Sequence, residues 1–206
     1  RKELVRCKMR TIGIMGGVGA GKSELLAYIE KNYNSRVLLA DTVGHLVKEP
    51  GQPCYEKLVA LLGKEILSPD GQIDRKAMAE KIFADPELLG KVNGMLHPAV
   101  ETYILEQIHL EKMRGTLDFF FIEAALLIEC GYEDKMDELW YIYADREVRA
   151  RRLKASRGYS DEKIQEIMDS QLSEEEFRRH CQVVIDNSGS LQDAYRQIDE
   201  ILKGNV

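Results

Sequence analysis

The fold of this chain is decided by Gly16-Gly17-Val18-Gly19-Ala20-Gly21-Lys22-Ser23. This octapeptide fits the phosphate-binding loop pattern G-x-x-x-x-G-K-[S/T] without a mismatch, and it follows the apolar run Thr11–Met15, which has the composition of a buried strand. Its glycines allow successive backbone N–H groups to point toward one phosphate group. We expect Lys22 to reach the β- and γ-phosphates and the Ser23 hydroxyl to ligate Mg²⁺. The stretch therefore predicts a nucleoside triphosphate site at the start of a helix that runs from Lys22 to about Lys31.

The composition is that of a globular protein, and at this net charge any basic patch must be local, which suits small anionic ligands. Of the 206 residues, 44% are hydrophobic and 31% are charged. The formal net charge of −6 argues against a general nucleic-acid-binding protein, which carries a basic surface. No apolar run is long enough to span a bilayer, and Arg1–Lys8 lacks the apolar core of a signal peptide. The four cysteines are scattered without metal-ligand spacing, which indicates free thiols in a reducing compartment. We therefore expect a cytoplasmic protein that binds neither nucleic acid nor membranes, and that is a monomer or self-associates weakly.

Five short apolar runs separated by amphipathic stretches predict a doubly wound parallel sheet with helices on both faces. Polar residues follow each run, and ligands of such sheets lie outside the carboxyl ends of the strands. The site is therefore expected at that edge. The predicted strands are Thr11–Met15, Val37–Ala40, Phe119–Ile122, Leu139–Ala144 and Val183–Ile185, followed in turn by the phosphate loop, Asp41, Glu123, Asp145-Arg146 and Asp186-Asn187.

Two helical segments interrupt this pattern. Residues 50–115 are almost entirely helical in pattern, with Asp74 as an N-cap and a break at His97-Pro98, and we expect them to bind the acceptor. Residues 147–180 are rich in arginine, and Ser160 and Ser173 are expected to begin helices there. We expect this segment to close over the triphosphate as a lid, although a solvated charged face would have the same composition. The nucleotide-binding core then comprises residues 9–49, 116–146 and 181–206.

A phosphate loop is shared by GTPases, ATPase motors and small-molecule kinases. The chain has no N-K-x-D guanine signal, and its size and two helical segments favour a kinase. Such a kinase needs a carboxylate beside the acceptor hydroxyl, for which Asp41 is the candidate, with helix capping as a compatible alternative. Glu123 is expected to hold Mg²⁺ directly or through water. His97 is as compatible with a structural role as with a ligand contact.

Six stretches, taken in order, resemble the signature of one enzyme family. They are Ile14–Ser23 for L-T-G-G-I-G-S-G-K-S, Ala40-Asp41 with Glu49-Pro50-Gly51 for D-A-D…E-P-G, Asp70-Gly71-x-Ile73-Asp74-Arg75 with Phe83 for D-G-x-I-D-R…F, His97-Pro98 for H-P, Leu126–Glu129 for P-L-L-F-E, and Val184–Ser190 for V-I-D-N-x-G-S. From about Arg10 to Leu202 the chain is thus similar to the dephospho-coenzyme A (dephospho-CoA) kinases.

The resemblance implies a P-loop kinase that transfers the γ-phosphate of ATP to the ribose 3′-hydroxyl of dephospho-CoA in the last step of CoA synthesis. It places Asp41 at the family's proposed catalytic aspartate and Asn187 near the adenine of ATP. The expected site is catalytic at Asp41, Lys22 and Arg152, binds ATP at Gly16–Ser23, Arg149 and Asn187, binds the acceptor at Asp41, Arg75 and His97, and binds Mg²⁺ at Ser23 and Glu123.

Several positions depart from the family pattern. Leu39 replaces the first aspartate of D-A-D, and Ala125 replaces the proline of P-L-L-F-E. In the lid, R-L-x-x-R-D-G becomes Arg152–Gly158 with Ser156-Arg157, which moves one arginine by a single position. Two alternatives therefore stay open: another P-loop nucleoside or nucleotide kinase, and an ATP-binding homologue without turnover.

Overall fold

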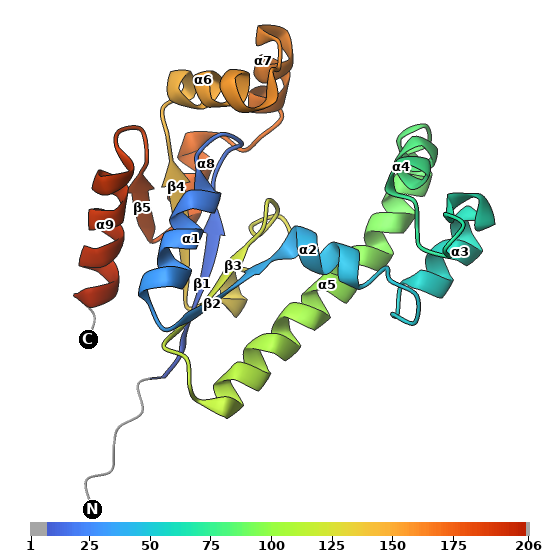
Figure 1. Cartoon of the computed structure of the whole chain (residues 1–206), viewed down its shortest axis with the longest axis horizontal. Coiled ribbons are helices and arrows are strands. Elements are labelled where there is room, and N and C mark those ends of the chain that lie inside the picture. The colour runs from blue at the N-terminus through green and yellow to red at the C-terminus, as the bar shows by residue number, and fades with distance from the viewer. Residues whose placement is uncertain (1–7, 205–206) are drawn as a thin grey trace, which may run out of the picture. The chain divides into compact units, whose positions relative to one another are not determined.

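A computed structural model describes residues 8–204 (Figure 1). Residues 1–7 and 205–206 lie outside this description, and with them Cys7, most of the charged segment Arg1–Lys8 and the end of the expected core segment 181–206. The chain forms two compact units: Leu38–Arg114 is one, and the other joins the chain up to Val37 with the chain from Gly115 onward. We refer to the latter as the sheet unit and to Leu38–Arg114 as the helical unit.

The sheet has five strands, as the sequence predicts, and their order is β2-β3-β1-β4-β5. The pairings of β1 with β3, of β1 with β4 and of β4 with β5 are parallel. The first strand lies at the centre, where Ile12 is in register with Phe121 on one side and Glu138 on the other. The bounds of the strands are β1 Arg10–Met15, β2 Ser35–Leu39, β3 Phe119–Glu123, β4 Glu138–Tyr143 and β5 Val183–Asp186.

The helices of the sheet unit lie between these strands along the chain or follow the last of them. Two of them, α1 and α9, pack with β1, β3, β4 and β5 in one apolar core. At its centre the buried ring of Trp140 meets Phe121 edge to face, with the ring centroids 5.7 Å apart. The helices of this unit are α1 Lys22–Asn32, the 3-10 turn η2 Glu133–Lys135, α6 Arg146–Arg157, α7 Asp161–Asp169, α8 Glu174–His180 and α9 Leu191–Lys203.

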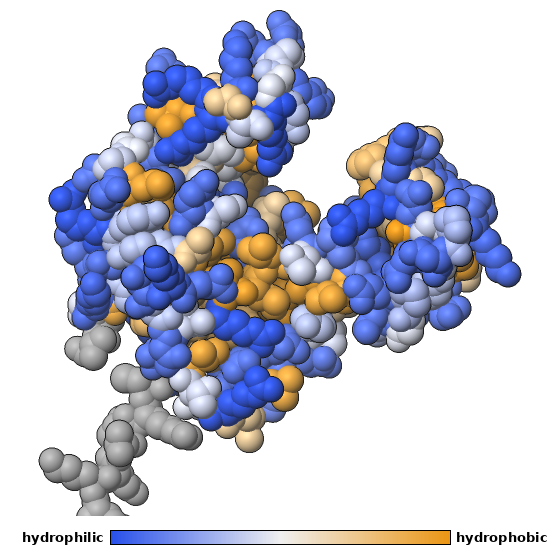
Figure 2. Space-filling view, in the orientation of Figure 1, coloured by the Kyte–Doolittle hydropathy of each residue, from blue (hydrophilic) through white to orange (hydrophobic). Residues whose placement is uncertain are grey.

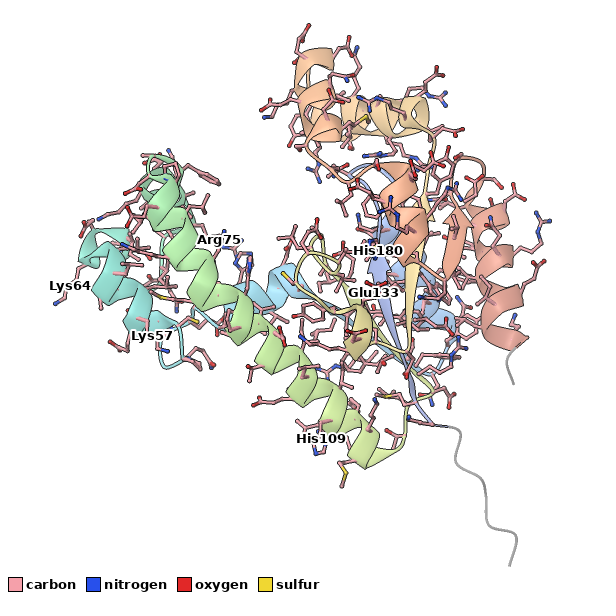
Figure 3. All side chains as sticks on the ribbon, turned by 180° about the vertical axis from the view of Figure 1, so that it is seen from behind. Lys57, Lys64, Arg75, His109, Glu133 and His180 are labelled. Atoms are coloured by element: carbon pink, nitrogen blue, oxygen red, sulfur yellow. The ribbon has the colours of Figure 1, made fainter. Side chains whose placement is uncertain are left out.

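Helix α8 is attached to the sheet by ring stacking and by a polar link at its end. The Phe177 ring stacks on Tyr141 of β4, with centroids 4.7 Å apart. His180, the last residue of α8, lies beside Glu133 of η2 (Figure 3), and its Nδ1 is 3.0 Å from one carboxylate oxygen. These two contacts fix the position from which the chain enters β5.

Helix starts follow the local signals in the sequence. Ser160 accepts a hydrogen bond from the Lys163 N–H, and Ser173 forms a capping box with Glu176, as predicted. Asp74 likewise accepts from the N–H groups of Lys76 and Ala77 at 2.8 and 3.1 Å. These caps depend on neighbours within three residues, which is why the sequence alone indicates them.

One prediction for the helical unit, a helix break at His97-Pro98, is wrong. His97-Pro98 does not break the chain, because α5 continues through Pro98. A proline inside a helix removes the hydrogen bond to the carbonyl four residues earlier, which in this helix is that of Gly94. Gly94 and Pro98 are both exposed, so water can hydrate that carbonyl. The elements of this unit are α2 Ala40–Leu46, α3 Tyr55–Leu62, the 3-10 turn η1 Lys64–Ile66, α4 Arg75–Phe83 and α5 Pro86–Arg114.

The described helices and cysteines give no sign of a membrane span or of a disulfide between residues 8 and 204. None of the helices between residues 8 and 204 combines the length and the apolar composition needed to cross a membrane. Three of the four cysteines lie in this range, at Cys54, Cys130 and Cys181, and each is a free thiol. The expected free thiols are therefore confirmed at these three positions.

Candidate active site

The phosphate loop connects the central strand to the first residue of α1. Gly21 precedes that helix with φ of 83°, a left-handed conformation that glycine adopts without strain. A Cβ at this position would lie 2.5 Å from the side-chain nitrogen of Asn187. Glycine is therefore required at residue 21 for two reasons, its backbone angle and the close approach of Asn187.

Lys22 is held at the base of the loop by its own backbone and by a carboxylate. Its Nζ donates to the carbonyl oxygen of Gly16 at 2.8 Å and lies 3.7 Å from Glu123 Oε1. Glu123 is the last residue of β3 and is in register with Ile14 of β1, so the strand ends bring the two charges together. The pair is about one-fifth exposed and lies at the carboxyl edge of the sheet, where the sequence predicted the site.

Two arginines of α6 donate hydrogen bonds to carbonyl groups of the same loop. Arg149 Nε donates to the Val18 carbonyl at 2.9 Å, and Arg152 Nη1 donates to the Ala20 carbonyl at 3.2 Å. Burial lowers the pKa of Arg149, and the charge of Arg146 lowers it further. An arginine remains charged despite such a shift. The positive end of α1 thus has two guanidinium groups and one ammonium group beside it.

Asn187 follows β5 and joins it to the loop. Its side-chain nitrogen donates to the Ala20 carbonyl at 2.8 Å, and its backbone carbonyl accepts from Arg152 Nη2 at 2.7 Å. The residue is 1% exposed, and its Oδ1 has no hydrogen-bond partner among the described residues. In this arrangement the side chain of Asn187 braces the loop.

The lid segment has a small apolar core of its own. Leu153, Ile164 and Met168 form it, and Val18 of the phosphate loop packs against it. Hydrophilic side chains cover most of α6 and α7 on the face shown in Figure 2. The displaced arginine, Arg157, ends α6, and its guanidinium lies 5.8 Å from the centre of the Tyr159 ring. Among the lid arginines, Arg149 and Arg152 rather than Arg157 contact the loop.

In the helical unit, Asp41 is exposed in the first turn of α2. Leu39 occupies the N-cap position and makes no side-chain cap, so the capping alternative for Asp41 is wrong. His45 lies one turn further on; burial lowers its pKa, as do the nearby charges of Arg75 and Lys48, while Asp41 raises it. Burial and Arg75 also lower the pKa of Lys48. Two cationic side chains, Arg75 and Lys48, and the exposed carboxylate of Asp41 therefore lie close enough to His45 to change its pKa.

The remaining two acceptor candidates lie on other helices of this unit. Arg75 is the first residue of α4 and is exposed; it is labelled in Figure 3. Its charge lowers the pKa of both His45 and Lys48, so the start of α4 lies close to α2, which carries Asp41. His97 lies within α5 immediately before Pro98, and it too is exposed. The structure thus brings Arg75 to the helix of Asp41, and an acceptor contact at His97 stays a prediction.

Comparison with known proteins decides the family. The family model described as dephospho-CoA kinase matches residues 10–193. The chain belongs to the dephospho-CoA kinase family. A dephospho-CoA kinase from Geobacter sulfurreducens is 37% identical over 194 residues, which cover 94% of this chain and 97% of that protein. The dephospho-CoA kinase of Aquifex aeolicus is also 37% identical, over 94% of this chain and 96% of its own.

Solved structures agree with membership of the dephospho-CoA kinase family. A protein from Thermus thermophilus is 31% identical, with a TM-score of 0.78 over 96% of this chain and 98% of its own. The dephospho-CoA kinase from Campylobacter jejuni has a TM-score of 0.72 and 26% identity, over 95% of this chain and 98% of its own. A shikimate kinase from Acinetobacter baumannii, at 14% identity and a TM-score of 0.53, shares the P-loop kinase fold alone.

Sequence reasoning missed one residue of this dephospho-CoA kinase family member that contacts the loop. Gln171 lies between α7 and α8, and its Oε1 accepts a hydrogen bond from the Val18 N–H at 3.3 Å. The same oxygen accepts from Arg149 Nη2. A single glutamine between two helices has no motif around it, so nothing local in the sequence indicates this contact.

Proposed function

We propose that the protein transfers the γ-phosphate of ATP to the ribose 3′-hydroxyl of dephospho-CoA, giving CoA and ADP. The single observation that carries this proposal is the phosphate loop with Lys22, Arg149 and Arg152 at its rim, in a chain of the dephospho-CoA kinase family. Lys22 Nζ lies 3.7 Å from Glu123 Oε1 at the loop, and in a phosphate-binding loop this lysine reaches the β- and γ-phosphates.

In the proposed reaction the 3′-oxygen attacks the γ-phosphorus while the bond to the β–γ bridging oxygen breaks. The hydroxyl proton passes to Asp41, which is exposed and therefore accessible to an acceptor. Lys22, Arg149 and Arg152 stabilise the negative charge that develops on the phosphate oxygens and on the leaving ADP. The helical unit holds the acceptor, with Arg75 and His97 as its contacts and residues 147–180 as the lid.

The donor set at the loop fits Mg²⁺. One hydroxyl, Ser23, follows Lys22, and one carboxylate, Glu123, lies beside it. Magnesium in kinases binds through one or two protein oxygens together with substrate phosphates, rather than in a complete protein cage. When bound, the ion would neutralise phosphate charge. We further propose that the protein acts in the cytoplasm, mainly as a monomer, without a nucleic-acid partner.

The test is ADP release with Mg²⁺-ATP, in the presence and absence of dephospho-CoA, followed by mass spectrometry of the acceptor. We expect ADP release that depends on dephospho-CoA and a product with the mass of CoA. Retained ATP binding without turnover of this acceptor would contradict the proposal. A panel of nucleosides and nucleotides would then test for a different acceptor.

A further inference from the structure

Gln171 occupies an unusual position for a residue outside every motif. It lies in the short link between α7, which ends at Asp169, and α8, which begins at Glu174. Its Oε1 is the common acceptor of two donors that belong to the nucleotide site, the Val18 N–H and the Arg149 guanidinium. Both donors are groups of the kind that bind phosphate.

The three residues close a ring of hydrogen bonds. Arg149 Nε donates to the Val18 carbonyl, Arg149 Nη2 donates to Gln171, and the Val18 N–H donates to Gln171 as well. The guanidinium also lies against Gly17, since a Cβ at that position would come within 2.2 Å of Arg149 Cζ. The orientation of Arg149 is thus fixed by the loop and by Gln171 together.

The side chain of Gln171, which holds the Arg149 guanidinium, is an amide and carries no charge. Arg146, one turn earlier on α6, pairs with the carboxylate of Asp169 at 2.8 Å. Arg149, in contrast, makes no ion pair with a carboxylate of residues 8–204; its partners are the neutral oxygens of Val18 and Gln171. Its charge therefore remains uncompensated beside the phosphate loop.

We infer that Gln171 is a positioning residue, which orients Arg149 over the phosphate loop while leaving its positive charge available to the nucleotide phosphates. The inference rests on the proposed function in one respect, since it takes the loop to bind ATP. Glutamine suits this role because glutamate would accept the same hydrogen bonds but neutralise the guanidinium. An apolar residue of similar length would leave the guanidinium without its second anchor.

The test compares Gln171→Glu and Gln171→Met with the matched controls Gln165→Glu and Gln165→Met. Gln165 belongs to α7, and its side chain bonds to Asp169 rather than to the loop. Affinity for a non-hydrolysable ATP analogue is measured by calorimetry, alongside kcat and KM. We expect both Gln171 variants to bind the analogue roughly 10- to 100-fold more weakly: Gln171→Met because it removes a hydrogen bond to a charged group, and Gln171→Glu because it neutralises the guanidinium of Arg149. The Gln165 variants should stay within about twofold of the wild type.

A double-mutant cycle with Arg149→Ala separates positioning from a general structural effect. If Gln171 acts through Arg149, then Gln171→Met should change analogue affinity by less than about twofold in the Arg149→Ala background. Fully additive losses would overturn the inference, and so would wild-type affinity and turnover of Gln171→Glu. Because analogue binding needs no acceptor, failure of the wild-type protein to make CoA would contradict the proposed function alone.

Discussion

The side-chain nitrogen of Asn187 donates a 2.8 Å hydrogen bond to the carbonyl oxygen of Ala20, which lies 167 residues earlier in the chain. The end of the fifth strand thereby supports the loop that follows the first. Gly21 leaves room for this contact, because any Cβ there would collide with the Asn187 amide. The shape of the loop is therefore a property of the whole sheet unit and not of the octapeptide alone.

Substitution of Asn187 by alanine should destabilise the protein by about 0.5–1.5 kcal/mol, the usual net contribution of one hydrogen bond, because the Ala20 carbonyl then keeps only its 3.2 Å hydrogen bond from Arg152. Urea unfolding followed by the fluorescence of Trp140, the single and fully buried tryptophan, measures this change. The control is Asn32→Ala, which removes an exposed hydrogen bond of the same type, to the Tyr28 carbonyl. An equal effect of the two substitutions would argue against a bracing role for Asn187.

Lys22→Ala should impair both ATP binding and phosphate transfer, because the Lys22 ammonium stabilises the negative charge of the phosphates in the ground state and in the transition state. Its contacts with Gly16 and Glu123 show that it lies within the loop. Steady-state kinetics with varied ATP should show a raised KM and a lowered kcat. Lys31→Ala, an exposed residue in the last turn of α1, serves as the control. Normal ATP saturation of Lys22→Ala would make the loop assignment wrong.

Asp41→Asn should lower turnover by roughly 10²- to 10⁴-fold, the usual effect of losing a general base, with little change in ATP affinity. The folded structure should tolerate it, because Asp41 is exposed and does not occupy the N-cap of α2. Asp85→Asn is the matched control: Asp85 accepts from the N–H groups of Glu87 and Leu88, and asparagine caps as well as aspartate. Turnover of Asp41→Asn within a few-fold of wild type would remove Asp41 from the mechanism.

The arginines of the lid should differ in importance. Arg149→Ala and Arg152→Ala each remove a guanidinium that contacts the loop, and we expect kcat/KM to fall roughly 10²-fold or more. Arg157→Ala should have little effect, since that side chain packs over Tyr159. Kinetics of the three variants provide the comparison. A large loss in Arg157→Ala alone would reverse this assignment.

Cys181 should resist alkylation in the folded protein. Burial, with the charge of Glu133 beside it, raises the pKa of its thiol to about 12. At pH 8 only about one thiol in 10⁴ would then be ionised, and the thiolate is the reactive form. Peptide mapping after iodoacetamide treatment should show Cys181 modified in urea but not in buffer. Rapid native modification would contradict the raised pKa of this partly exposed thiol.

The sequence predicted the strands well because each is an apolar run with a clear end, although Ala40 begins α2 rather than ending β2. The helix caps were also predictable, since their partners lie within one turn. The helix break at Pro98 was predicted wrongly. The free-energy cost of a proline within a helix depends on whether water can reach the carbonyl that loses its hydrogen bond, here that of Gly94, and this exposure is a tertiary property.

The candidate site likewise contains residues that the sequence indicates and residues that it does not. The loop and the strand-end residue Glu123 follow from motif and topology, and the structure places Lys22 and Glu123 together. The contacts of Gln171, in contrast, depend on how α6 and α7 pack against the loop. That packing joins residues far apart in sequence, so no local pattern encodes it.

The strand order has a consequence for synthesis on the ribosome. The loop is translated directly after the first strand, which lies at the centre of the sheet, but Asn187, which braces it, is translated only after all five strands. Nascent or truncated chains that stop before β5 therefore carry the complete octapeptide without its support. Such chains should not retain nucleotide, so that nucleotide retention would distinguish chains that contain β5 and Asn187 from chains that stop before them.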